Sequence, residues 1–249
     1  MQLEEMSQFF NTRVDTYEEH MRTCVDGATE YYEKTAAHFP ERGAIHILDL
    51  GCGTGLELDA LWKRNPEIEV TGVDLAGDML AVLRKKHPDK KLHLIQASYF
   101  DVDFGEGRFD AAVSVQTMHH FTHEEKISLY RRLCACLKPG GWYVETDYMA
   151  PDSRYEEQCF ADYERLKQEQ ELGEGFYHFD RPCTVKHQLS MLRTAGFTDV
   201  QECWRCGGNK HTFGKTCRPM TMRRCVQARP VLGHSPGLSQ YNLTDGKER

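Results

Sequence analysis

Ile47-Leu-Asp-Leu-Gly-Cys-Gly-Thr-Gly55 is the stretch of this 249-residue chain that decides its fold. The apolar run of residues 44–50 leads into its glycines, and a segment compatible with a helix follows them. Such a run, ending in glycines before a helix, is typical of a buried parallel strand. The glycines let the backbone turn sharply and let a ligand approach the main chain, beside the unpaired N–H groups of the helix. Taken alone, the loop fits an ordinary tight turn equally well.

The alternation of strand and helix continues beyond this loop. Strands are predicted at residues 69–73, 92–96, 109–115, 142–147 and 198–204, a turn at 139–141, and helices at 77–86, 123–137, 153–171 and 184–195. Strands separated by helices of about ten to fifteen residues indicate a mostly parallel sheet with helices on both faces. The sequence therefore predicts an α/β fold with a Rossmann-like core over residues 41–148.

Further segments flank this core. Residues 1–40 have apolar side chains at helical spacing and predict a helical cap with a break near Asp26-Gly27. Residues 149–182 predict an inserted lid helix and a loop, and residues 183–208 add the last helix and a strand of the core. Residues 209–249 lack periodicity and predict a basic, disordered tail, although a final strand would be expected near 209–214.

Composition limits the class of protein. The net charge of −7 argues against a protein that coats nucleic acid, even though the stretch from Arg205 onward holds nine Lys or Arg and two Asp or Glu. The ten cysteines are irregularly spaced and suggest free thiols in a reducing compartment. We find neither an apolar run of about 20 residues for a membrane span nor a secretory signal. We therefore expect a cytoplasmic protein.

An acidic residue makes the glycine loop more specific. Asp74 ends the predicted second strand, 23 positions after Gly51, where a carboxylate can accept hydrogen bonds from both ribose hydroxyls of an adenosine cofactor. The dinucleotide fingerprint GxGxxG requires a third glycine at position 56, but Leu56 stands there. The pattern therefore disfavours a dinucleotide.

With these features the chain resembles the class I S-adenosylmethionine-dependent methyltransferases of the small-molecule type. Five segments in order carry the resemblance, which covers about positions 8–204: Ile47–Gly55, Gly72–Leu80, Phe109–Phe121, Leu137–Trp142 and Ala195–Phe197. The resemblance implies a seven-stranded sheet, an inserted lid helix after the fifth strand, and S-adenosylmethionine as cofactor.

The resemblance also implies a set of cofactor-binding residues. They are Tyr17, Asp49, Gly51, Cys52, Gly53, Thr54, Gly55, Asp74, Leu75, Met79, Ser98, Tyr99 and Gln116. The glycines would border the methionine portion, Asp49 would anchor its amino group, and Asp74 the ribose. Leu75 and Met79 would flank the adenine, where Ser98 replaces the family's usual Asp with a weaker acceptor. Tyr17 would close over the cofactor, although plain helix packing explains it equally well.

Methyl acceptors in such open sheets bind beyond the carboxyl ends of the strands. The polar side chains expected there are His119, His120, Asp147, Tyr148, His178 and Asp180. His120, His119 and His178 are the candidate catalytic residues, because a base is needed where the acceptor carries a proton at neutral pH. The two adjacent histidines could instead merely finish a strand, and His178 and Asp180 could be a structural pair that pins the lid.

No metal site is expected. Cys203-Trp-Arg-Cys206 precedes the tail and is followed by His211, Cys217 and Cys225, but no second CxxC or HxxxH completes a zinc set. A tail that contacts RNA is also disfavoured, because its basic residues lack interleaved aromatic side chains.

The leading hypothesis is a methyltransferase that acts on a small organic molecule. One alternative is a methyltransferase of RNA or another macromolecule, which would require a basic rim around the cleft. The other is a cofactor-binding or scaffold protein without transfer activity. The sequence leaves the acceptor atom and the oligomeric state open, since the fold positions the donor and not the acceptor.

Overall fold

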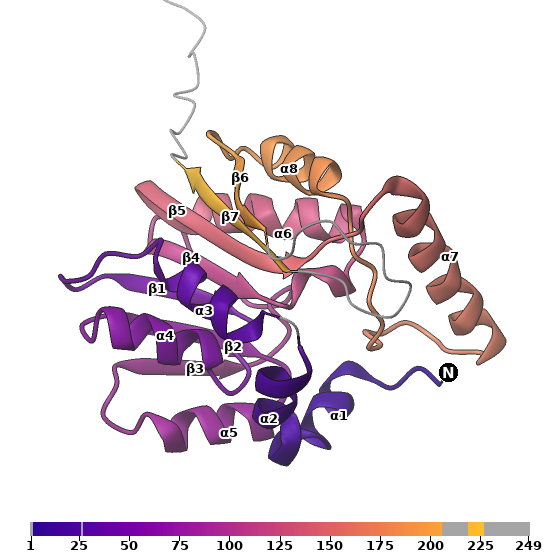
Figure 1. The fold of residues 1–249 in the computed structure, drawn as a ribbon, viewed down its shortest axis with the longest axis horizontal. Helices are drawn as coiled ribbons and strands as arrows, with labels where there is room; N and C mark the ends of the chain where they lie inside the picture. Colours follow the sequence, from indigo (N-terminus) through magenta and orange to yellow (C-terminus); the bar gives the residue numbers. More distant parts are fainter. Residues whose placement is uncertain (1, 26, 206–218, 227–249) are drawn as a thin grey trace, which may run out of the picture.

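The computed structural model describes residues 2–25, 27–205 and 219–226. Its centre is one sheet in the order β3-β2-β1-β4-β5-β7-β6 (Figure 1). The strands are β1 His46–Leu50, β2 Glu69–Asp74, β3 Leu92–Gln96, β4 Phe109–Val115, β5 Leu137–Tyr148, β6 Gln201–Arg205 and β7 Pro219–Val226. Strands β1 to β5 are parallel, and β7 runs antiparallel to both β5 and β6. The predicted Rossmann-like α/β sheet is confirmed for its five parallel strands.

Helices cover both faces of the sheet (Figure 1). They are α1 Met6–Asn11, α2 Val14–Cys24, α3 Ala28–Ala36, α4 Leu56–Arg64, α5 Gly77–Lys86, the 3-10 turn η1 Met118–His120, α6 His123–Cys136, α7 Ser153–Glu169 and α8 Val185–Thr194. Side chains alternate between the faces of a strand, so Ala111 and Val113 of β4 pack with α3, α4 and α5, whereas Ala112 packs with α6 and α8. Two apolar cores therefore hold the central strands by both faces.

The start of α6 is determined by a capping box. Thr122 Oγ1 accepts a hydrogen bond from the Glu125 backbone at 3.2 Å, and the Glu125 carboxylate accepts one from the Thr122 backbone at 2.7 Å. Such a box satisfies N–H groups that the first helical turn leaves without partners. It caps α6 at Thr122, two residues after His120, and so limits how far the preceding turn can shift.

The turn predicted at residues 139–141 lies within β5 instead. Phe109 pairs with Leu137 and Ala111 with Trp142, so three extra residues of β5 bulge out between the two pairs. Gly140 takes the left-handed φ of 84° that this bulge needs. Gly140 and Gly141 indicated that the chain changes direction here, but the sequence could not show that β5 also pairs with β4 before them, at Leu137.

The structure also corrects both ends of the predicted chain organisation. The cap contains three helices, because a further break at Thr12-Arg13 separates α1 from α2. Strand β7 lies within the segment predicted to be a disordered tail, and the range 209–214, where a final strand was expected, lies outside the described residues. Pro219 and the adjacent Arg223 and Arg224 interrupt the alternation of polar and apolar residues that would indicate a strand. None of the helices in the described part of the chain has the length and hydropathy needed to cross a membrane.

Candidate functional site

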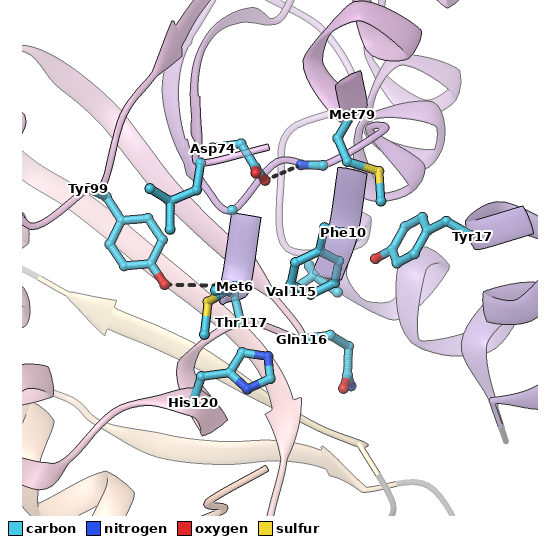
Figure 2. A pocket seen from close by; sticks show the side chains of 13 residues that line it. Met6, Phe10, Tyr17, Asp74, Met79, Tyr99, Val115, Gln116, Thr117 and His120 are labelled. Carbon is cyan, nitrogen blue, oxygen red and sulfur yellow. Dashed lines mark hydrogen bonds between the residues drawn. The ribbon is translucent and has the colours of Figure 1, made fainter. Parts of the chain in front are cut away.

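A cavity with about 540 Å³ of empty space, partly open to solvent, lies at the carboxyl ends of β1, β2 and β4 (Figure 2). Open parallel sheets bind ligands at this edge. The lining consists of Met6, Phe10, Tyr17, Gly51, Gly53, Asp74, Leu75, Met79, Tyr99, Val115, Gln116, Thr117 and His120. The chain therefore presents a hollow where the sequence placed the glycine loop.

Many predicted site residues meet in this lining. They are Tyr17, Gly51, Gly53, Asp74, Leu75, Met79, Tyr99, Gln116 and His120. Sequence reasoning missed Met6, Phe10, Val115 and Thr117. Phe10 lies in the same cap segment as Tyr17 and could have been chosen with it, whereas no local signal marks Met6 or Thr117, whose positions depend on tertiary packing.

Asp74 ties the glycine loop to the end of β2. Its carboxylate accepts hydrogen bonds from the backbone N–H groups of Gly53 and Ala76, each at 2.8 Å. Burial raises the pKa of Asp74, and these backbone donors oppose the rise. The carboxylate is thus fixed at the cavity wall and keeps lone pairs for further donors.

The glycines of the loop serve different purposes. A Cβ at Gly51 would lie 2.6 Å from Thr117 Oγ1, and one at Gly55 would lie 2.4 Å from Leu83 Cδ1, so these positions allow close packing of the protein itself. Gly53 has a φ of +45°, and a Cβ there would meet nothing within 4 Å. Gly53 therefore leaves an open cradle that a ligand can enter.

Asp49 in β1 is completely buried, and its one hydrogen-bond partner among the described residues is the buried carboxyl of Glu57. Burial, the Asp49 charge and this hydrogen bond raise the pKa of Glu57 well above the usual range. Burial raises the pKa of Asp49 to about 7, and the charge of Asp74 adds to the rise, whereas the hydrogen bond from Glu57 opposes it. Two buried carboxyl groups that have only each other as partners within the described residues fit a ligand with an ammonium group.

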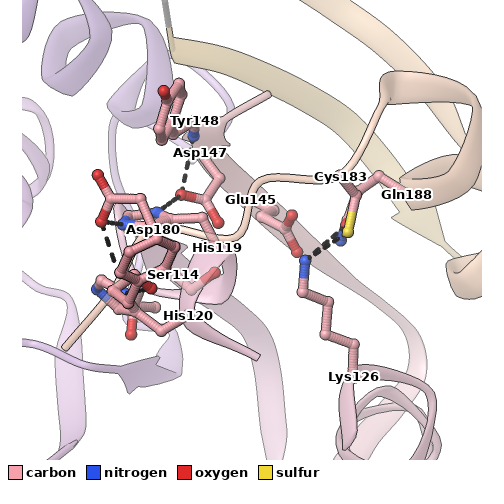
Figure 3. Close-up of polar contacts among 12 residues, drawn as sticks. Ser114, His119, His120, Lys126, Glu145, Asp147, Tyr148, Asp180, Cys183 and Gln188 are labelled. Atoms are coloured by element: carbon pink, nitrogen blue, oxygen red, sulfur yellow. Dashed lines mark hydrogen bonds and ion pairs between the residues drawn. The ribbon is translucent and has the colours of Figure 1, made fainter. Parts of the chain in front are cut away.

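A second polar cluster lies on η1 and the segment after α7 (Figure 3). His119 Nδ1 lies 2.5 Å from Asp147 Oδ1, and its Nε2 lies 3.4 Å from Asp180 Oδ1. Although burial opposes it, these two carboxylates raise the pKa of His119 to about 10. His119 therefore bridges two acidic groups and does not line the cavity.

His120 borders the cavity beside this cluster. Its Nδ1 lies 3.1 Å from the carbonyl oxygen of Phe179 and 3.8 Å from Asp180 Oδ1. Burial and the charge on His119 lower the pKa of His120 well below its usual value. Of the three candidate catalytic histidines, His120 is the one that the structure places at the cavity wall (Figure 2).

His178 stacks on Phe9 of the cap, with ring centroids 3.5 Å apart and planes 6° from parallel. Burial lowers the pKa of His178 to about 4. Its backbone N–H donates to the Glu4 carbonyl at 2.9 Å, and Arg181 N donates to the His119 carbonyl at 2.7 Å. Residues 176–181 thus join the N-terminal cap to η1, the turn that carries His119 and His120 and that we call the histidine turn. We call residues 176–181 the strap.

Other predicted residues lie outside the lining, namely Asp49, Cys52, Thr54, Gly55 and Ser98. The Cys52 side chain packs under β2, where a Cβ at Gly72 would lie 2.7 Å from its Sγ. Thr54 is buried, and its carbonyl accepts a hydrogen bond from Lys86 at 3.1 Å. Ser98 Oγ accepts a hydrogen bond from the Phe100 backbone at 3.2 Å. Contacts of these residues with a cofactor stay predictions.

Comparison with known proteins identifies the class of this site. Residues 47–141 match a family model described as a methyltransferase domain. Over 79% of the chain the fold matches 44% of the phosphoethanolamine N-methyltransferase 2 of Haemonchus contortus, solved with S-adenosyl-L-methionine, at a TM-score of 0.60 and 20% identity. Residues 47–141 are thus similar to a methyltransferase domain, and the likeness to the Haemonchus contortus enzyme shows a shared fold.

Curated relatives share part of the chain. The O-methyltransferase cnsE of Penicillium expansum is 26% identical over 63% of this chain and 55% of its own length. The demethylmenaquinone methyltransferase of Thermus thermophilus is 35% identical over 45% of this chain and 50% of its own length. The chain thus spans about half the length of these relatives.

Proposed function

We propose that this protein transfers a methyl group from S-adenosylmethionine to a small organic molecule. The observation that carries the proposal is the buried carboxyl pair of Asp49 and Glu57, in which Asp49 has no partner other than Glu57 within the described residues, beside the open cradle at Gly53. A cofactor with a cationic amino group and an adenosine portion supplies partners for both features and for Asp74.

Different residues around the glycine loop would bind different portions of the cofactor. When bound, S-adenosylmethionine supplies an electrophilic methyl group on a sulfonium. Asp49 would face the amino group, Gly53 would border the methionine chain, and Asp74 would accept from the ribose hydroxyls. Leu75 and Met79 provide apolar surface for the adenine at the far wall of the cavity.

The cap would exclude water from the reaction. Met6 and Phe10 of α1 and Tyr17 of α2 line the cavity from the side opposite the sheet edge (Figure 2). Alignment of the reactants and exclusion of water are the main requirements of such a displacement, and orientation alone contributes about 7–11 kcal/mol in favourable cases. We take α7 and the strap as a lid over the acceptor, and β6 and β7 as the completion of a seven-stranded sheet.

A small acceptor suits the shape and charge of the site. The cap closes over the cavity, His120 borders it, and Asp147 and Asp180 stand close behind. A polyanionic acceptor such as RNA would meet these carboxylates, which is unfavourable. Relatives named as an O-methyltransferase and as a demethylmenaquinone methyltransferase agree with a small acceptor. A cytoplasmic location stays a prediction from the sequence.

Methyl-labelled cofactor tests the proposal. The full chain is incubated with it and with separate small-molecule, RNA and protein fractions of a cell extract, and Asp74→Asn serves as the control. We expect label in the small-molecule fraction with the wild-type protein and much less with Asp74→Asn. Label in RNA or protein would favour the macromolecular alternative, and cofactor binding without transfer would favour a scaffold.

A further inference from the structure

We propose that His119, His120 and Asp180 bind a divalent first-row transition-metal ion beside the methyl-transfer cavity. The three residues each offer one ligand atom, and these atoms lie within 4.8 Å of one another. Two imidazoles and one carboxylate are a ligand set that suits iron, cobalt, nickel or zinc better than magnesium or calcium. None of these ligands belongs to the segment Cys203-Trp-Arg-Cys206.

The spacing of the ligand atoms matches a metal site. His119 Nε2 and His120 Nδ1 lie 3.4 and 3.8 Å from Asp180 Oδ1. Ligands about 2.0–2.1 Å from a tetrahedral ion lie about 3.4 Å from one another, whereas charged N–H···O bonds are about 2.7–2.9 Å long. These two distances are longer than strong charged hydrogen bonds and stand near the separations that an ion between the groups requires. The hydrogen bond between His120 Nδ1 and the Phe179 carbonyl, 3.1 Å away, would have to break for Nδ1 to bind the ion.

Asp147 orients one of the ligands from behind. It pairs with His119 Nδ1 at 2.5 Å and leaves Nε2 to face Asp180. Metal-binding histidines almost always use their second ring nitrogen in this way, and the carboxylate fixes the ring and raises its basicity. Asp147 is itself buried and receives a hydrogen bond from the Tyr148 backbone at 2.9 Å, so it cannot turn away easily.

The backbone brings the ligands together before any ion binds. His119 and His120 occupy one 3-10 turn between β4 and the capping box of α6. Arg181 N donates to the His119 carbonyl, and the Arg181 guanidinium donates to the His120 carbonyl. Arg181 thus bonds the strap to both histidines of η1, which holds the neighbouring Asp180 opposite the imidazoles (Figure 3).

A second cluster of similar composition, His123, Glu156 and Cys183, is a poorer site. Lys126 Nζ lies 3.0 Å from Cys183 Sγ, and its positive charge disfavours a dication there. The Glu156 carboxylate already accepts from the Thr184 backbone at 2.8 Å and pairs with His187 at 2.8 Å. Glu156 therefore provides a matched control, a buried acidic residue of a histidine cluster that should not affect metal binding.

An ion at this position would take part in methyl transfer; this inference rests on the proposed function. His120 belongs both to the metal site and to the cavity lining. An ion held there would act as a Lewis acid toward an acceptor that carries an oxygen or nitrogen donor. The favoured substrates are therefore small molecules with a metal-binding hydroxyl, carboxylate or amine next to the atom that is methylated.

Titration of the chelator-treated full chain with Co²⁺ tests the site, with visible absorption and calorimetry as readouts. We expect one tightly bound ion, with the d–d bands of nitrogen and oxygen ligands and without thiolate charge transfer. Asp180→Asn should weaken binding at least tenfold, and Asp147→Asn about 10- to 100-fold. Glu156→Gln should leave binding unchanged.

Circular dichroism and calorimetric binding of S-adenosylhomocysteine verify that each variant is folded. Unchanged Co²⁺ affinity in Asp180→Asn, a thiolate spectrum, or loss of binding in Glu156→Gln would overturn the proposal. Failure of the proposed function has a different signature, because the chain would then bind Co²⁺ but not S-adenosylhomocysteine.

Discussion

A buried carboxylate that lacks a hydrogen-bond partner destabilises a protein unless a ligand or a proton meets it. Asp49 has no hydrogen-bond partner other than the Glu57 carboxyl within the described part of the chain, and burial raises the pKa of Glu57 well above its usual value. Because folding raises the pKa of Asp49 to about 7, folding favours its protonated form. The free energy of unfolding of the ligand-free protein should therefore fall as pH rises from about 4 to about 7.

Binding of the cofactor should show the opposite dependence on pH. A cationic amino group requires the ionised form of Asp49, so affinity for S-adenosylhomocysteine should rise about tenfold between about pH 6 and pH 8. Asp49→Asn cannot ionise and should bind about tenfold more weakly at pH 8, with a flatter profile. Calorimetry across this range measures both effects, and a wild-type profile as flat as that of Asp49→Asn would exclude the proposed contact.

The cradle at Gly53 allows a matched comparison. Gly53 and Gly43 have positive φ values of 45° and 89°, and a Cβ at either would meet nothing within 4 Å. Alanine at either position should cost about 1–2 kcal/mol of stability, because left-handed backbone disfavours a side chain. Only Gly53→Ala places a methyl group in the cavity and should also weaken S-adenosylhomocysteine binding, by at least tenfold. Equal affinities of the two variants would show that the cradle is not used.

How far the site could be predicted depends on the kind of residue. Gly51, Gly53 and Asp74 were identifiable because their roles depend on spacing within one strand–loop–helix unit. Thr117 and Met6 were not, because they reach the cavity only after separate elements pack together.

At the scale of elements, the cap and the strap form one unit. Met6 N donates to the Phe176 carbonyl, and Glu5 pairs with Tyr177 in an antiparallel bridge. Binding at the cavity should therefore protect α1, α2 and the strap together, even though about 165 residues separate them in sequence. Hydrogen exchange with and without S-adenosylhomocysteine measures this, with β3 as an internal reference. Protection of α1 without the strap would show that they open independently.

The elements themselves were predictable where periodicity is local. Strands β3 and β4 and helix α5 have the predicted bounds, because each is a continuous apolar or amphipathic run between polar breaks. The bulge at Gly140 and strand β7 were not predictable, since strand pairing with distant partners determines both.

For the whole molecule, ligand binding adds to stability by mass action. S-adenosylhomocysteine at about 100 times its Kd should contribute about 2.7 kcal/mol, which for a domain of this size raises Tm by about 5–10 °C. NAD at the same concentration should leave Tm unchanged, because Leu56 stands where the dinucleotide fingerprint has glycine. A larger shift with NAD would assign the cavity to a dinucleotide.

The charge of the whole molecule bears on its partners but not on its site. The net charge of −7 favours a small acceptor over RNA, which stays a prediction. The sequence placed His119, Asp147 and Asp180 at one edge of the sheet, but their pairing follows from the packing of three distant segments. The parallel strands β4 and β5 bring His119 and Asp147 to one edge of the sheet, and the strap supplies Asp180.

Calorimetric titration of the full chain with S-adenosylhomocysteine tests the central claim most directly, which is that this cavity holds the cofactor through Asp49, Gly53 and Asp74. We predict one binding site per chain, with affinity at least tenfold lower in Asp74→Asn while circular dichroism stays unchanged. No heat of binding by the wild-type protein, or equal affinity in Asp74→Asn, would contradict the account.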